Sequence, residues 1–431
     1  MERADNGLEV HLLPTRETRG SLCLLSLENP LSGDREAHAL LPDLLTRGTA
    51  QTPGLAEMAA RCEALFETDL VASVTAAGPN QLLRFGFEVL ADRFAGGVRV
   101  FDQAVELLAE TLHQPALEAG RLRSDHLLQE RDNLVRSIAG LRDDYGLLAW
   151  RRLVESMHAG TPWALHSWGD QDSAAALDEA RVHAAWDRAR GQLAGRLVLV
   201  GDLSMEQALE AAAKLGGDSQ RPAPAAPRLP PAVSDAAAAS GVGAAANGAQ
   251  AGGVREGHDR LPLRQSQLVL GFAMEHEAMA GPSAALMAAV FGGGSHSRLF
   301  KRVREAEGLA YGCGGSLLVD SATLVVQAGI DGDQAARVRE LVLAELSSLA
   351  LDGPRQDELD VARRALQRRL DAIMDSPREL MGWRLFALAT GRETHPERAS
   401  RLLSEVQPED VARAAGAVSL HSAYLLEGTS K

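Results

Sequence analysis

The chain has 431 residues, more than one hydrophobic core usually organises, so two or more domains are expected. Its composition, 45% hydrophobic and 24% charged with no apolar run long enough to cross a bilayer, is typical of a globular protein and excludes membrane insertion. The formal net charge of −14 argues against nucleic-acid binding and makes basic or neutral peptides the easier partners.

The N-terminus and the cysteines both indicate a reducing compartment. The first residues, MERADNGLEVHLLP, lack the basic segment and apolar core of a secretion signal. The three cysteines, Cys23, Cys62 and Cys313, are widely separated and show no paired metal-ligand spacing. We therefore expect a cytoplasmic protein.

Strands and helices are predicted in the same order in the two halves of the chain. In the first half, strands are expected at 20–27, 69–76, 81–89 and 196–200, with long helices at 101–113 and 122–141 before the last strand. In the second half the counterparts are strands at 266–273, 310–319, 322–330 and 422–426, and helices at 334–350 and 356–374. Trp150 and Trp383 follow similar acidic turns. The shared order indicates an internal duplication.

One segment, residues 221–259, is dominated by Ala, Gly and Pro. Such a composition buries too little apolar surface to order itself, so this segment is predicted to be a flexible linker. The expected domains are therefore residues 1–220 and 260–431. Because strands precede a block of helices in each, both are expected to be α+β domains with helices packed on a mostly antiparallel sheet.

The most specific stretch of the second half is FGGGSHSRLFKRVREAEGLAYGCG, residues 291–314. Gly292, Gly293 and Gly294 allow the backbone to turn and to approach a peptide closely, although a plain turn between helices is an alternative. Arg304 and Tyr311 follow, and their hydrogen-bond donors suit a substrate carbonyl or an oxyanion. The other interpretation is an arginine on the surface and a tyrosine packed at the start of a strand.

The run GGGSHSRLFKRVREAEGLAY closely resembles the C-terminal domain of M16 (pitrilysin-like) zinc metallopeptidases. The resemblance continues in LLPDLLTRGT, ALHSWGDQDS, VGDLS and MDSPREL, which look most like the non-catalytic YmfF-type branch. It implies two homologous α+β domains of the M16 (LuxS/MPP-like) type. It also implies that Arg304 and Tyr311 help to hold the substrate and stabilise the transition state, with the glycine loop contacting the peptide.

Catalytic M16 members carry an HxxEH motif, in which two histidines bind zinc and the glutamate activates water. Alignment on Arg47–Thr49 puts Ala39 and Asp43 at the histidine positions and Pro42 at the position of the general base. The third ligand position is taken by Ser137, with Glu130 at a supporting acidic position. The resemblance therefore implies that this chain binds no zinc.

A rebuilt metal site is the alternative. His38 stands one residue from the expected position, and His126 and Glu130 are spaced four apart on a predicted helix. Together with Asp43 these side chains supply the donor types of a metal site. Scattered histidines and acids on helices are, however, more often surface or supporting groups.

Three functions follow from this pattern. The first is a non-catalytic, substrate-positioning subunit of a heterodimeric M16 peptidase, whose partner is a catalytic M16 paralogue with an intact zinc motif. The zinc would then lie in the partner, and Arg304 and Tyr311 would act in trans on a peptide substrate. The second is a structural or peptide-binding scaffold with an M16 shell. The third is an autonomous metallopeptidase that uses the rebuilt site.

Overall fold

The computed structural model describes residues 1–31, 34–226, 253–275 and 281–429. The chain forms two compact units. Unit 1 comprises Met1–Ala139, His166–Pro227 and Asp375–Ala389, and unit 2 comprises Gly140–Leu165, Arg228–Met374 and Thr390–Lys431. The units differ from the contiguous domains predicted at 1–220 and 260–431, because each contains one segment from the other half of the sequence.

Unit 1 contains a sheet in the order β1-β2-β8-β3-β5-β4. Its strands are β1 (Glu2–Arg3), β2 (Glu9–Pro14), β3 (Gly20–Pro30), β4 (Asp69–Ala77), β5 (Asn80–Leu90) and β8 (Ala194–Gly201). Every neighbouring pair is antiparallel except β2 and β8, which run parallel.

Unit 2 contains a sheet in the order β11-β12-β10-β13-β9. Its strands are β9 (Arg255–Leu261), β10 (Ser266–Met274), β11 (Ala310–Leu318), β12 (Thr323–Ile330) and β13 (Val418–Gly428). Only β9 and β13 pair in parallel. Apart from β1, the two sheets have the same strand order and the same single parallel pair. The prediction of two homologous α+β domains with mostly antiparallel sheets is confirmed.

The longer helices also correspond between the two halves of the sequence. Those of the first half are α1 (Arg35–Leu45), α2 (Leu55–Ala64), α3 (Val100–His113), α4 (Ser124–Gly140), α5 (Tyr145–Met157), α7 (Glu179–Gly191) and α8 (Met205–Gly216). Those of the second half are α11 (Pro282–Gly292), α12 (Ala335–Asp352), α13 (Gln356–Asp375), α14 (Pro377–Thr390), α15 (Pro396–Glu405) and α16 (Pro408–Gly416). Two short two-residue strands, β6 (Leu117–Glu118) and β7 (Arg121–Leu122), and a short helix, α6 (Gln171–Ala175), complete unit 1.

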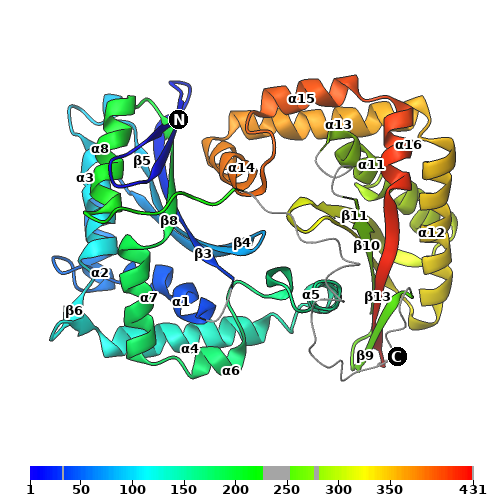
Figure 1. The fold of residues 1–431 in the computed structure, drawn as a ribbon, viewed down its shortest axis with the longest axis horizontal. Coiled ribbons are helices and arrows are strands. Elements are labelled where there is room, and N and C mark those ends of the chain that lie inside the picture. Colours follow the sequence, from blue (N-terminus) through cyan, green and yellow to red (C-terminus); the bar gives the residue numbers. More distant parts are fainter. Residues whose placement is uncertain (32–33, 227–252, 276–280, 430–431) are drawn as a thin grey trace. The chain divides into compact units, whose positions relative to one another are not determined.

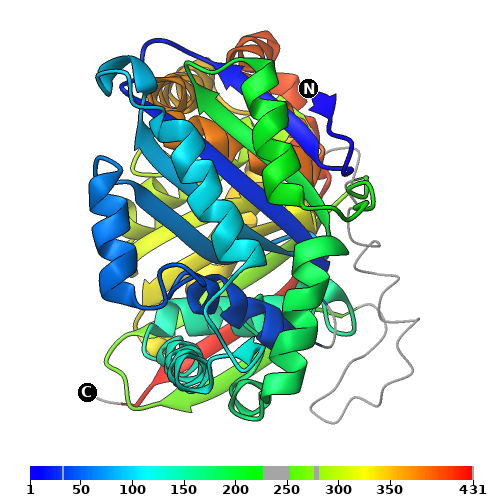
Figure 2. The ribbon, with the colours of Figure 1, turned by 90° about the vertical axis from the view of Figure 1, so that its left-hand side faces the viewer.

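The main core of unit 1 lies between its sheet and the helices on one face. In Figure 2, α3 (cyan) and α8 (green) cross this face of the sheet, whose strands are drawn in blue except for β8, which is green. Phe85 and Phe87 of β5 are buried there, and the rings of Phe87 and Phe101 meet edge to face at 5.6 Å. Leu25 of β3 and Leu108 of α3 are buried in the same cluster.

Strand β3 is buried on both faces, as the continuous apolar run in its sequence indicates. Cys23, Leu25 and Leu27 face the main core, whereas Leu22 and Leu24 belong to a second buried cluster. That second cluster is completed by Val198 and Val200 of β8 and by Met381 and Leu385 of α14. A helix from the second half of the sequence thus covers the second face of the first sheet.

The converse arrangement is found in unit 2. Ala149, Leu153 and Met157 of α5, from the first half of the sequence, pack on Val269 and neighbouring strand residues. Figure 1 shows α5 on one side of β10 and β13, with α12 and α16 on the other side. Gly271 of β10 is required here, because a Cβ atom at this position would collide with Met157. The two halves therefore exchange equivalent helices, α5 and α14, each of which carries one tryptophan of the predicted repeat.

Both ends of the predicted linker at 221–259 are structured. The Arg221 side chain is buried and donates to the carbonyl oxygens of Ala189, Arg190 and Leu193 at 3.0, 2.7 and 3.0 Å. At the other end, β9 pairs with β13. Residues 227–252, the rest of the predicted linker, lie outside the described residues. Within the described part of the chain, none of the helices is long and apolar enough to cross a membrane.

His158, which follows the end of α5, is expected to make the stability of the protein depend on pH. His158 is 2% exposed, and its Nε2 lies 3.1 Å from Thr323 Oγ1. Burial, followed by the nearby charges of His421 and Arg255, lowers the pKa of His158 to about 4. The unfolded chain, with a histidine pKa of about 6.5, binds more protons between these values, so stability is complete above about pH 6.5 and falls as the pH drops towards 4.

Replacement of His158 by glutamine is therefore expected to reduce this acid-dependent loss by about 2–3 kcal/mol. The free energy of unfolding in urea at pH 7 and at pH 4.5 measures the effect. Glutamine at the exposed His395 serves as the matched control and should leave the difference unchanged. Equal pH dependence of His158→Gln and the unmodified protein would contradict the prediction.

Candidate functional site

The glycine loop begins at Gly292, the last residue of α11, and its three glycines have different environments. Gly292 is buried, and a Cβ atom there would collide with the backbone of Gly315 on β11. Gly293 and Gly294 are exposed, and Gly294 has a φ of +136°, which favours glycine. Gly292 thus allows the helix to lie close to the strand, whereas Gly293 and Gly294 are the members of the predicted peptide-binding loop that a ligand can reach.

Arg304 lies on a π-helix, η3 (Phe300–Ala306). In a π-helix the hydrogen bonds join residues five positions apart, and here the Glu307 amide donates to the Arg302 carbonyl oxygen at 3.2 Å. The helix start is anchored by Arg298, whose guanidinium pairs with Glu358 of α13 at 2.9 Å and donates to the Gly353 carbonyl at 2.9 Å. Arg304 itself is exposed, and its guanidinium carbon lies 4.7 Å from the centroid of the Phe300 ring. The side chain is supported by an aromatic face while its donors remain accessible.

Tyr311 occupies a bulge of β11. Ala310 is paired with Ile330 and Gly312 with Gly329, so Tyr311 is the extra residue between two consecutive partners. Such an insertion redirects a side chain locally. The Tyr311 side chain is 69% exposed. The structure therefore presents Arg304 and Tyr311 as accessible donors on consecutive elements, and among the described residues no hydrogen bond joins them.

The positions of the zinc motif lie on α1. Ala39 and Pro42 are buried and supply no metal-binding atom. Pro42 stands inside the helix, where its carbonyl accepts a hydrogen bond from Thr46 Oγ1 at 2.9 Å. Asp43 is exposed, and its carboxyl pKa is raised by loss of solvent and by the negative charge of Glu130. Asp43 and Glu130 are therefore close enough to influence each other.

Glu130 of α4 is held by Arg47 rather than left free for a metal. The two side chains form an ion pair in which both are nearly buried, with exposed fractions of 13% for Arg47 and 9% for Glu130. Asn133 Nδ2 also donates to the Glu130 carboxylate at 2.9 Å. Ser137, at the third ligand position, is exposed. The positive charge beside Glu130 is thus the guanidinium of Arg47.

The alternative metal site of His38, Asp43, His126 and Glu130 is not formed. His38 is fully buried, and its Nδ1 lies 2.9 Å from the Asp34 carbonyl oxygen. Burial lowers the pKa of His38 to about 4, which keeps the ring neutral. Over residues 1–31, 34–226, 253–275 and 281–429, no three His, Cys, Asp or Glu side chains are placed to hold a metal ion together. The zinc of catalytic M16 members does not fit the residues present.

The Arg47–Glu130 pair allows a direct test. Arg47→Ala leaves a nearly buried carboxylate without its partner and is expected to lower the free energy of unfolding by about 2–4 kcal/mol. The double replacement Arg47→Met with Glu130→Leu removes both charges and should recover most of that loss. Urea denaturation at pH 7 provides the measurement. If Arg47→Ala unfolds at the same urea concentration as the unmodified protein, the pair does not have this role.

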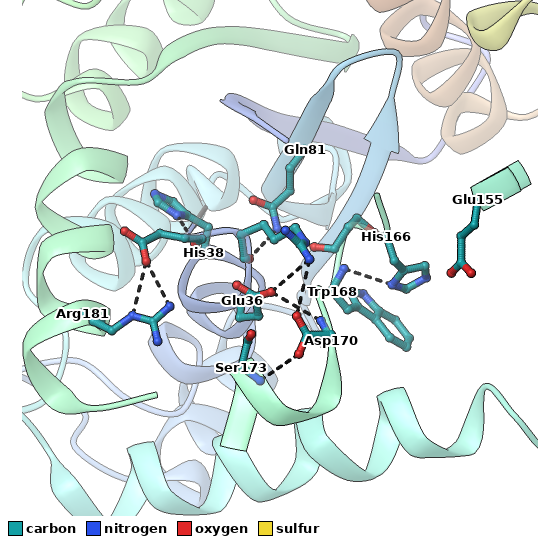
Figure 3. Close-up of polar contacts among 12 residues, drawn as sticks. Glu36, His38, Gln81, Glu155, His166, Trp168, Asp170, Ser173 and Arg181 are labelled. Atoms are coloured by element: carbon teal, nitrogen blue, oxygen red, sulfur yellow. Dashed lines mark hydrogen bonds and ion pairs between the residues drawn. The ribbon is translucent and has the colours of Figure 1, made fainter. Parts of the chain in front are cut away.

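A polar network beside α1 was missed by the sequence analysis, which used the segment 164–173 only for its resemblance. Figure 3 shows Glu36 and Asp170 of this network. The Asp170 amide donates to the Glu36 carboxylate at 3.4 Å, and Arg35 lies within 3.4 Å of Glu36 and 3.6 Å of Asp170. Gly169 has a φ of +81°, and a Cβ atom there would collide with the buried Glu36 side chain. The sequence signal for this contact is the glycine that directly precedes Asp170.

Gln81 of β5 ties the network to the sheet. Its Nε2 donates to the carbonyl oxygens of Arg35 at 2.8 Å and Ser167 at 2.6 Å, and its Oε1 accepts from Asn29 at 2.8 Å. The network therefore fixes the N-terminus of α1, the helix that carries the degenerate zinc positions.

Known proteins similar to this chain are M16 peptidase homologues. Residues 196–366 match the family model described as the Peptidase M16 inactive domain. Over 429 residues, which cover 98% of this chain and 96% of the relative, the chain is 23% identical to "Probable inactive metalloprotease YmfF" of Bacillus subtilis. The chain is thus similar to M16 peptidases in sequence, through the family model over residues 196–366 and through this relative over nearly the whole chain. Both matches are to proteins described as inactive.

Solved structures share the fold of this chain over nearly its whole length. A conserved protein from Enterococcus faecalis has a TM-score of 0.85 at 20% identity, with coverage of 98% of this chain and 96% of that one. A peptidase M16 inactive domain protein from Pseudomonas fluorescens has a TM-score of 0.78 at 19% identity, with coverage of 100% and 98%. A protease from Helicobacter pylori has a TM-score of 0.76 at 15% identity, with coverage of 99% and 98%. At these identities the likeness concerns the fold alone.

Proposed function

We propose that this chain is the non-catalytic, substrate-positioning subunit of a heterodimeric M16 zinc metallopeptidase. The partner is a catalytic M16 paralogue with an intact zinc motif, and it supplies the zinc. Arg304 and Tyr311 of this chain act in trans on a peptide bound at that zinc site. The complex processes peptides or proteins.

One contrast carries the proposal. The positions that would bind zinc or activate water hold Ala39, Pro42, Asp43 and Ser137, of which only Asp43 has a carboxylate. Arg304 and Tyr311, by contrast, are exposed on a π-helix and a β-bulge. Both irregularities are departures from regular structure that recur at functional sites. A guanidinium and a phenol can together donate hydrogen bonds to a developing oxyanion. These donors serve catalysis only if a zinc-bearing chain is present.

The scaffold hypothesis remains the second candidate. It is favoured by the packing role of Gly292, because at least one residue of the glycine loop is accounted for by the fold alone. In a scaffold, the shell would serve assembly or peptide binding, and replacement of Arg304 or Tyr311 would have no effect on any peptidase.

Reconstitution separates the two candidates. The chain is mixed with a catalytic M16 paralogue from the same organism, and cleavage of a fluorogenic peptide library is measured for each protein alone and for the mixture. Zinc is quantified in each protein. Activity that appears only in the mixture supports the proposed subunit. A stable complex whose activity equals that of the paralogue alone favours the scaffold.

A further inference from the structure

Arg84 of β5 lies on the face of the first sheet that α14 partly covers. Phe85 and Phe87 belong to the main core, and because side chains alternate along a strand, Arg84 points to the opposite face. The strand register pairs Arg84 with Ser26 of β3 on one side and with Ser73 of β4 on the other. Directly opposed residues have Cβ atoms about 4.5–5.5 Å apart, so two hydroxyl side chains flank the guanidinium. We name Ser26, Arg84 and Ser73 the Arg84 site.

The acidic residues of the surrounding strands, β2, β3, β4, β5 and β8, are all ion-paired with other arginines. Arg196 of β8 holds two of them, and Arg378 at the start of α14 holds the other two. The pairs are Arg196 with Glu9 at 3.1 Å, Arg196 with Glu28, Arg378 with Asp69 at 3.0 Å and Arg378 with Glu88 at 2.6 Å. No carboxylate of these strands is left over for Arg84.

Arg84 itself has no ion pair or side-chain hydrogen bond with any residue that the structure describes. Its Nε is shielded from solvent, while the side chain as a whole remains partly exposed. Burial alone lowers the pKa of the Arg84 guanidinium, and no carboxylate acts in the opposite direction. A partly buried charge without a partner costs stability, and proteins keep such a cost where the residue serves binding.

The sheet is filled on one side of the Arg84 site. Leu24 of β3 and Val71 of β4 lie two residues along their strands from the two serines. Leu24 is a member of the second buried cluster, Val71 packs against it, and Met381 of α14 completes it. A peptide that reaches Arg84 therefore meets apolar packing in this direction and cannot continue across the sheet. This arrangement favours a chain end over the middle of a peptide.

We propose that the Arg84 site binds the C-terminal carboxylate of a peptide. The Arg84 guanidinium donates to both carboxylate oxygens, and the exposed Ser73 hydroxyl donates a further hydrogen bond. Buried Ser26 is the uncharged neighbour on the other side. One cation between two hydroxyls matches one carboxylate. The inference rests on the proposed function only in taking the ligand to be a peptide.

The test is direct binding to the full chain without a partner. A peptide of Ala, Gln and Leu, labelled with fluorescein at its N-terminus, is compared by anisotropy with the same peptide amidated at its C-terminus. Because hydrogen bonds to charged groups are stronger than neutral ones, the free acid is expected to bind about 10- to 100-fold tighter. Equal binding of the acid and the amide would overturn the proposal.

Variants locate the site. Arg84→Gln should bind the acid and the amide equally, whereas Arg84→Lys keeps the charge and should retain part of the preference. Ser73→Ala should weaken binding of the acid by about 2- to 10-fold. Arg121→Gln, at a side chain of unit 1 that is 74% exposed, is the matched control and should retain the full preference. A full preference in Arg84→Gln, or its loss in Arg121→Gln, would contradict a site at Arg84.

Stability separates a binding role from a structural one. Since Arg84 has no partner to lose, Arg84→Gln is expected to unfold at the same urea concentration as the unmodified protein or at a higher one. A clear decrease would assign Arg84 to the fold and count against the proposal.

Two further arms complete the design. An amidated peptide with one internal Glu should bind no tighter than the amidated parent, and Arg84-dependent binding as tight as that of the free acid would reject the chain end in favour of side-chain carboxylates. The result is also independent of the partner. Preference for the free acid without activity in the reconstituted mixture would refute the peptidase subunit but not the Arg84 site. Activity in the mixture with equal binding of the acid and the amide would do the reverse.

Discussion

Replacement of Arg304 by alanine is expected to lower the kcat/KM of the reconstituted peptidase pair by about 100- to 1000-fold. This is the usual effect of removing one donor that stabilises the oxyanion of a transition state. The loss should fall mainly on kcat, since such a donor acts more strongly on the transition state than on the bound peptide. Steady-state kinetics with a fluorogenic peptide provide the measurement.

Controls for this prediction use the same chain. Arg401→Ala removes an exposed arginine of unit 2 and should leave the kinetics unchanged. Tyr311→Phe removes the second donor and is expected to reduce kcat in the same direction. Size-exclusion chromatography must show that Arg304→Ala still assembles with the paralogue. Normal kcat/KM in an assembled Arg304→Ala complex would contradict the proposed role of Arg304 and favour the scaffold hypothesis.

The second large effect concerns the exchanged helices. A fragment of residues 1–226 retains the first sheet but lacks α14. It therefore loses the burial of Met381 and Leu385 against Leu22 and Val198. Burial of one such side chain contributes about 1.5–3 kcal/mol, and typical domains are stable by only about 5–15 kcal/mol in total. The fragment is expected to be insoluble or partly unfolded alone.

Co-expression of residues 1–226 with residues 253–431 should restore solubility, because the second fragment brings α14 and receives α5. The soluble fraction and the elution volume of the mixture measure this. In the full chain, Leu385→Ala should lower the free energy of unfolding by about 2–5 kcal/mol. Leu351→Ala, at a side chain that is 81% exposed, is its control. A monomeric 1–226 fragment with a cooperative unfolding transition would disprove the exchange as a folding requirement.

Much of the candidate site was predictable because it depends on residue identity. Ala39 and Pro42 have no metal-binding atom in any conformation, and the order Gly292, Arg304, Tyr311 is written in the chain. The contacts of these residues were not predictable. The burial of Gly292, the bulge at Tyr311 and the Arg47–Glu130 pair each depend on a strand or helix that is distant in sequence.

The amino-acid sequence by itself determined the duplicated α+β order, the M16 resemblance and the loss of the zinc motif, because periodicity and residue type are local properties. It also contains the continuous apolar run of β3, which the structure shows to be buried on both faces. Only the tertiary structure decided that α14 covers β3 and that α5 covers the second sheet, since either helix of the repeat has a suitable apolar face. The choice between them depends on the path of the chain through both units, which no local pattern records.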